Sequence, residues 1–308
     1  MLRWLIFLLL CLLLQDLHWK VEEELPSEGA VQEVRNTEPL VGPALMRQDL
    51  LAGLASTPCQ VFPGNLPWAA LRKVALHREQ IIEEILRDEP GGAIKFLQMS
   101  LERYNREVQG YSCILVKKER VEGTVRPLEK TECYFREKPF SVFINFLAGA
   151  GEAQRVLYVQ GENNGKMLAR ATGLPGVLGA LPFDVNSPKA RKAGRYIVTE
   201  FGIKLGSERT LKAMLSAQGR KALHVRYDGI FRVPEVGDRL CYKIVRTPYE
   251  PLEDEGVYEL TLYFDVETWL QVGSILKGPN DYFIAEYFFR DVRINPKFKD
   301  NQFKKSAL

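Results

Sequence analysis

The sequence has few of the residues and motifs that carry catalytic or metal chemistry. Its three histidines, His18, His77 and His224, are far apart, and its five cysteines form no C-x-x-C or Cys/His spacing, so no zinc site is predicted. The chain also lacks a G-x-S-x-G elbow, a phosphate-binding glycine loop and an H-E-x-x-H helix. These absences favour a protein that is not an enzyme and needs no cofactor. An enzyme with dispersed catalytic residues is the less favoured alternative.

An excess of charge of one sign is missing as well. The 42 Lys and Arg residues nearly balance the 39 Asp and Glu residues, which argues against a nucleic-acid-binding protein. The acidic runs Glu22–Glu24 and Glu253–Glu255 are typical of solvated surface. Lys117 and Lys118, followed by Glu119 and Arg120, are interpreted as the polar end of a strand.

Long hydrophobic runs are absent except at the start. Trp4–Leu14 is an unbroken apolar run behind Arg3, shorter than the about 20 residues of a membrane-spanning helix. It predicts a signal peptide within residues 1–20 and export to the periplasm or cell envelope. No small-x-small cleavage triplet follows Leu14, so an uncleaved anchor is the alternative. Lipidation of Cys11 is less favoured, because Leu10 stands where a lipobox has Gly or Ala.

Proline and helical periodicity divide the rest of the first third. Residues 21–67 are rich in proline without a sustained period, which predicts a disordered tether. Residues 68–89 have apolar residues at helical spacing and predict a helix that precedes the core. A second amphipathic helix is expected after Pro90, with a stripe through Leu97 and Leu101 and a stop at Gly110. The folded domain is expected over residues 90–308.

After Gly110 the period changes to two, which predicts an α+β fold with a curved antiparallel sheet of about ten strands. The expected strands are Tyr111–Val121, Lys130–Arg136, Phe140–Leu147, Ala153–Gln160, Lys166–Ala171, Ala222–Val233, Asp238–Thr247, Gly256–Asp265, Thr268–Lys277 and Tyr282–Ile294. Short turns between most neighbours predict a meander. Residues 173–218 interrupt it, with a helical period over Lys204–Gln218, and are expected to form a lid.

The pattern of apolar residues indicates where a ligand would bind. Alternate residues of the strand 256–265 are apolar, and a sheet face of this size exceeds what one helix can cover. Two solutions stay open: a barrel filled by its own side chains, or a cavity for an apolar guest. The expected cavity and lid residues are Leu97, Leu101, Tyr258, Leu260, Leu262, Phe264, Leu174, Leu178, Leu181 and Phe183.

Two of the five cysteines have a spacing that suggests a pair. Cys113 and Cys133 lie symmetrically about Gly123, so a hairpin centred there would place them opposite each other. In an exported protein they are a candidate disulfide. Two buried free thiols are the alternative.

Several segments resemble a known fold family. The segment Tyr287–Pro296, followed by Asp300–Phe303, resembles the closing strand of LolA-like periplasmic lipoprotein carriers. Leu97–Gln109 running into Tyr111–Cys113 is similar to the way that fold begins. Tyr111–Cys113, Glu119-Arg120 and Arg136–Val142 resemble a domain of unknown function found in exported bacterial proteins and related to the LolA/LolB-like fold.

The resemblance spans about residues 90–303 and implies an unclosed barrel of about eleven antiparallel strands with helices along its hydrophobic concave face. In the carriers that face accepts lipoprotein acyl chains. The arginine that latches their lid has no match in this sequence.

Together these features predict a carrier or binding module of the cell envelope for a lipid, a lipoprotein acyl chain or another hydrophobic ligand. The alternative is an envelope sensor or scaffold that binds a protein partner through the same fold.

Overall fold

A computed structural model describes residues 79–173, 179–248 and 255–308. The expected signal segment 1–20, the tether 21–67, the first half of the helix 68–89, Leu174 and Leu178 lie outside these residues. Within them, residues 79–87 are helical, as the periodicity predicts. No helix in the described ranges is both long and apolar enough to cross a membrane.

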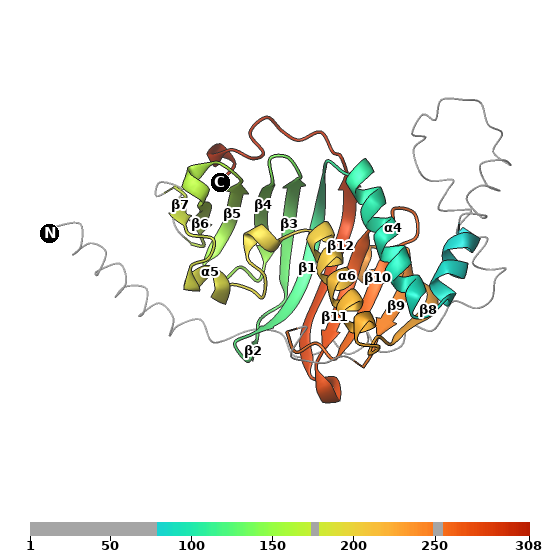
Figure 1. The fold of residues 1–308 in the computed structure, drawn as a ribbon. Coiled ribbons are helices and arrows are strands. Elements are labelled where there is room, and N and C mark those ends of the chain that lie inside the picture. The colour runs from blue at the N-terminus through green and yellow to red at the C-terminus, as the bar shows by residue number, and fades with distance from the viewer. Residues whose placement is uncertain (1–78, 174–178, 249–254) are drawn as a thin grey trace, which may run out of the picture. The chain divides into compact units, whose positions relative to one another are not determined.

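One twelve-stranded antiparallel sheet forms the centre of the molecule (Figure 1). Its strands are β1 (Gly110–Val121), β2 (Thr124–Val125), β3 (Glu129–Arg136), β4 (Ser141–Ala148), β5 (Ala153–Val159), β6 (Met167–Ala171), β7 (Leu181–Phe183), β8 (Val225–Val233), β9 (Arg239–Arg246), β10 (Glu259–Asp265), β11 (Gln271–Lys277) and β12 (Phe283–Ile294). All ten strands expected from the sequence are present, with ends shifted by at most three residues. The two additional strands are the short β2 and β7.

The order of the strands joins two meanders at the middle of the sheet. It is β7-β6-β5-β4-β3-β1-β12-β11-β10-β9-β8, with β2 paired to β1 alone. The first long strand, β1, therefore pairs with the last, β12, and the sheet does not close into a barrel because β7 and β8 lie at opposite edges. The α+β fold with a curved, unclosed antiparallel sheet is confirmed.

This order forces the chain between β7 and β8 to cross the whole sheet. The crossing contains α5 (Pro188–Lys192), the 3-10 helix η4 (Val198–Glu200) and α6 (Ile203–Gly219). With α4 (Gly91–Glu107), these elements lie on one side of the sheet, here called the helix face (Figure 1). The expected helix of the insertion is α6. The insertion also contributes β7, which extends the sheet through its pairing with β6.

Two helices fill one half of the helix face. The apolar stripe of α4 buries Phe96 and Leu97 completely, and Met214 of α6 is equally buried. They pack with Tyr242 of β9 and Phe264 of β10 in one apolar cluster. Over β8, β9 and the part of β10 around Phe264 the sheet is therefore closed by the protein's own side chains, as in the filled-barrel alternative.

The C-terminal segment covers the opposite face of the other half. Phe303 packs in a cluster with Phe143, Leu157 and Leu168 of β4, β5 and β6. Arg170 holds the chain end, because its Nη1 donates to the Leu308 carbonyl oxygen over 2.9 Å. Since this layer occupies the far side of β4–β6, the helix face is the side of these strands on which a ligand could be held.

The resemblance segment around Asn295 has a structural role. The Asn295 side chain accepts hydrogen bonds from the backbone N–H groups of Gln109 (2.7 Å) and Gly110 (3.2 Å) and donates to the Glu107 carbonyl oxygen (2.8 Å). It thus satisfies backbone groups where α4 ends and β1 begins. The end of β12 and the helix-to-strand junction are joined in this way.

Candidate ligand-binding site

A cavity of about 830 Å³ lies on the helix face, above the half of the sheet that α4 does not cover. Its floor comes mainly from β1 and β3–β7, and its roof from α5, η4 and the first turns of α6. Ligand sites in proteins have volumes of about 300 to 1,000 Å³, so the space is large enough for a drug-sized or lipid-like molecule.

Small side chains on the floor create this volume. The inward positions of β5 and β6 are occupied by Ala153 and Val156 and by Ala169 and Ala171. The alternate residues, such as Leu157 and Leu168, point to the C-terminal segment on the other face. In the filled half the same layer holds large rings, with Phe96 in edge-to-face contact with Phe264 at 5.2 Å between centroids. The empty space follows from the small residues and from the absence of a helix stripe above them.

The roof is held in place by local hydrogen bonds. Ser187 caps α5, since its Oγ accepts from the Ala190 N–H, and Pro188 begins the helix. The start of α6 is tied to the sheet, because the Ile203 N–H donates to the Tyr111 hydroxyl over 3.1 Å. Gly202 takes a φ of 130° there, which only glycine adopts readily, and lies close to Tyr111 and Phe135. Ile197 and Phe201, between these two anchors, face the cavity.

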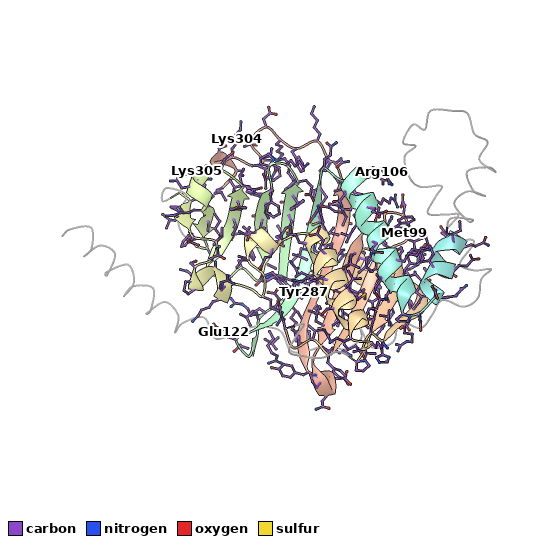
Figure 2. The ribbon with its side chains drawn as sticks, viewed as in Figure 1. Met99, Arg106, Glu122, Tyr287, Lys304 and Lys305 are labelled. Atoms are coloured by element: carbon purple, nitrogen blue, oxygen red, sulfur yellow. The ribbon has the colours of Figure 1, made fainter. Side chains whose placement is uncertain are left out.

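One wall of the cavity carries a polar cluster made of Lys117, Glu119, Glu129 and Tyr287. Lys117 Nζ lies 2.8 Å from Glu119 Oε2 and 3.2 Å from Glu129 Oε2. The Tyr287 hydroxyl donates to Glu119 Oε1 over 2.7 Å. Tyr287 comes from the central strand β12, as the side-chain view shows (Figure 2). All four side chains line the cavity, whose lining is mainly apolar but also includes other charged residues such as Arg126, Glu200 and Arg209.

Burial changes the proton affinities of this cluster. Burial raises the pKa of the Glu129 carboxyl, and the neighbouring Lys117 only partly offsets this effect. Burial lowers the pKa of Lys117, but Glu119 and Glu129 raise it by more, so the net shift is upward and the ammonium stays charged. Burial, followed by the charge of Glu119, raises the pKa of Tyr287. At neutral pH this tyrosine is a hydrogen-bond donor.

The structure distributes the expected site residues over different places. Leu260, Leu181 and Phe183 line the cavity, the last two from the edge strand β7. Leu97, Leu262 and Phe264 are fully buried in the filled half, and Leu101 is buried in α4, so these four are core residues outside the cavity lining. Tyr258 is exposed and also outside the lining. Of the eight expected site residues within the described ranges, three line the cavity and five do not.

The structure confirms the strand register predicted for the two cysteines but shows no bond between them. Cys113 pairs directly with Cys133 across β1 and β3, as the symmetry about Gly123 predicts. Both are buried free thiols in the structure.

The polar cluster was missed because Lys117 and Glu119 were interpreted only as part of the polar end of a strand. Lys117 and Glu119 continue the alternation of Tyr111, Cys113 and Leu115, which places them on the inner face. Lys118 and Arg120 are the outward residues and lie over the rings of Phe283 and Tyr282. Strict parity counting along β1 would have found the inward pair.

Among the described residues, no group of three or more His, Cys, Asp or Glu side chains is placed to hold a metal ion. The cavity lining offers apolar packing surfaces, the hydrogen-bonding groups of the polar cluster and further charged side chains such as Arg126, Glu200 and Arg209.

A comparison with protein families finds one match. The model described as "Protein of unknown function (DUF1571)" matches residues 108–307, which contain all twelve strands and the crossing segment. No curated protein sequence matches the chain.

Solved structures with a similar fold have low sequence identity. The Mycobacterium tuberculosis lipoprotein LppX is 11% identical, with 69% of this chain and 100% of that chain covered and a TM-score of 0.40. A LolA superfamily protein from Nitrosomonas europaea is 9% identical, with 68% and 98% covered and a TM-score of 0.31. The MucA/MucB complex structure from Pseudomonas aeruginosa gives 15% identity, 69% and 60% coverage and a TM-score of 0.39. These TM-scores are below 0.5 and do not indicate a function. The cavity is the feature that does.

Proposed function

We propose that this chain, which belongs to the family described as "Protein of unknown function (DUF1571)", is a non-enzymatic module that binds a lipid or another molecule with a long apolar part. The observation that supports this proposal is the cavity of about 830 Å³ with its mainly apolar floor, in which alanine and valine side chains of β5 and β6 leave space. Water in such a space would face mostly apolar walls, which costs free energy in proportion to the wetted area. An acyl chain would remove that cost.

The apolar run at the start of the chain supports a proposal for the cellular setting. The apolar run Trp4–Leu14 behind Arg3 supports export, and we propose that the protein acts in the periplasm or cell envelope. A hydrophobic ligand moving between membranes needs shielding from water in such a compartment. The cavity would provide it.

Filling the cavity tests the proposal. Ala169→Trp adds a large ring to the floor and should reduce uptake of the uncharged fluorescent probe N-phenyl-1-naphthylamine severalfold or more. Ala148→Trp is the matched control, because Ala148 is an exposed strand residue outside the cavity lining. Ala171→Phe fills another floor position. It controls for a folding defect that affects only Ala169→Trp. Circular dichroism and the melting temperature of each variant should show that the fold is kept.

The outcomes separate this function from binding of a protein partner. Uptake by the wild type and the Ala148 variant, with loss in the two filled variants, supports ligand binding. Native mass spectrometry after mild extraction should then show a co-purifying lipid on the wild type and the Ala148 variant but not on the two filled variants. No uptake by the wild type, or equal uptake by the filled variants, would refute the proposal and favour the sensor or scaffold alternative.

A further inference from the structure

The polar cluster runs across three neighbouring strands at one level of the cavity wall. Lys117 of β1 is in register with Glu129 of β3 on one side and with Tyr287 of β12 on the other. Glu119 lies two residues further along the inner face of β1. Charged side chains thus occupy neighbouring positions on a sheet face whose other lining residues are mostly apolar, with Thr131, Gln271 and Ser274 as uncharged polar ones.

The fold does not require charges here. Replacement of a buried ion pair by apolar residues of similar size is often neutral or stabilising, because desolvation offsets the attraction. Three apolar side chains would close this wall at least as well. The cluster therefore calls for an explanation other than stability.

Most of the cluster is already satisfied by its own members. Both oxygens of Glu119 are engaged, one by Tyr287 and one by Lys117. The crossing chain covers this pair at Gly194, where an added Cβ would lie 3.1 Å from Glu119 Oε2 and 3.2 Å from Lys117 Nζ. Lys117 already contacts two carboxylates, so its positive charge is balanced and is not available to bind a further anion.

Glu129 differs from the other members. Its Oε2 faces Lys117, whereas its Oε1 receives no hydrogen bond from the described residues. The residue is 6% exposed, so this oxygen borders the cavity and not the outer surface. Arg126 also lines the cavity, but its Nη1 donates to the Lys192 carbonyl oxygen at 2.9 Å. A carboxylate oxygen in such a place is a strong acceptor without a donor.

We propose that Glu129 is the head-group acceptor of the cavity, and that its Oε1 accepts a hydrogen bond from a hydroxyl at the polar end of an otherwise apolar ligand. This inference rests on the proposed function and specifies the ligand class as a hydroxyl-bearing lipid such as an acylglycerol. Lys117, Glu119 and Glu129 together carry one net negative charge. A carboxylate head at Glu129 Oε1 would place two carboxylates in contact and could donate no hydrogen bond, so it is disfavoured there although Arg126 also lines the cavity.

The test compares ligands that share one acyl chain. Monomyristoylglycerol has hydroxyl donors, methyl myristate has none, and myristate carries a negative charge. Each is used to displace N-phenyl-1-naphthylamine from the full-length protein, and binding of the probe itself reports whether the cavity is functional. For the wild type, monomyristoylglycerol should displace the probe at about tenfold lower concentration than methyl myristate.

Two variants of Glu129 and one control locate the effect. Glu129→Gln weakens the acceptor and Glu129→Met removes it, so monomyristoylglycerol should bind about tenfold less tightly to both, while probe and methyl ester are unchanged. Glu132→Gln is the matched control, because Glu132 lies on the same strand and its carboxylate accepts from Tyr134 outside the cavity. It should leave all three ligands unaffected.

Failure of the inference and failure of the proposed function give different results. If the wild type does not bind the probe, the ligand-binding function itself is wrong. If it binds the probe but prefers the methyl ester or myristate, or if the Glu129 variants keep the preference for the glycerol ester, the cavity stands and the role of Glu129 is overturned.

Discussion

Phe96→Ala tests the division of the helix face into a filled half and an empty half. The Phe96 ring is 0% exposed and makes edge-to-face contacts with Tyr242 at 5.5 Å and Phe264 at 5.2 Å between centroids. Truncation of a buried phenylalanine costs about 3 to 5 kcal/mol, because apolar transfer energy is lost and a cavity remains. At about 2 to 4 °C per kcal/mol for a domain of this size, the melting temperature should fall by roughly 10 °C.

Phe146→Ala is the comparison within the empty half. Phe146 is a half-buried residue of β4 that lines the cavity, so its ring already lacks neighbours on one side. Its truncation should cost about 1 kcal/mol, close to an average substitution. Urea denaturation followed by circular dichroism, with the midpoint and slope fitted for both variants, measures the difference. Equal losses for Phe96 and Phe146 would refute the claim that the protein fills only one half.

Three further predictions follow from single interactions. Asn295→Ala removes three hydrogen bonds at the junction of α4 and β1, and should destabilise the protein by about 1 to 3 kcal/mol, with faster hydrogen exchange at that junction but not in the filled half. Cys113 and Cys133 should resist thiol reagents in the native protein, since the hydrogen bond with Cys133, followed by burial, raises the pKa of Cys113. Both should react after unfolding without reductant; a disulfide in the peptide map would contradict this. Because burial raises the pKa of Glu129 above its usual 4.5, the folded state keeps a proton that the unfolded chain has released, so stability should decrease as pH rises from 4.5 through the raised pKa. Urea midpoints of wild type and Glu129→Gln across that range should show a smaller decrease in the variant; an unchanged pH dependence would contradict the role of burial.

The local pattern of the chain was sufficient to predict the elements. The change from a helical period to a period of two at Gly110 located α4 and ten strands, since each period reports which residues share a face. The symmetry about Gly123 also predicted that Cys113 and Cys133 face each other. Both are short-range properties that depend on neighbouring residues and turn length.

Long-range pairing could not be predicted in the same way. Nothing in β1 or β12 alone shows that the first and last long strands pair at the centre of the sheet. That pairing places β7 and β8 at opposite edges and makes the insertion a crossing over the helix face. Leu181 and Phe183 consequently belong to an edge strand under the cavity, although the sequence suggested a lid.

By itself, the sequence determined the α+β class, the register of the hairpins and an excess of apolar sheet surface, because these depend on the spacing of residues along the chain. Only the tertiary structure decided that α4 and α6 cover one half of that surface and leave the cavity over the other. It also decided that Lys117, Glu119 and Glu129 meet on the cavity wall. The physical reason is that a vacancy depends on which side chains face each other across the fold, and small residues such as Ala169 leave space only where no partner fills it.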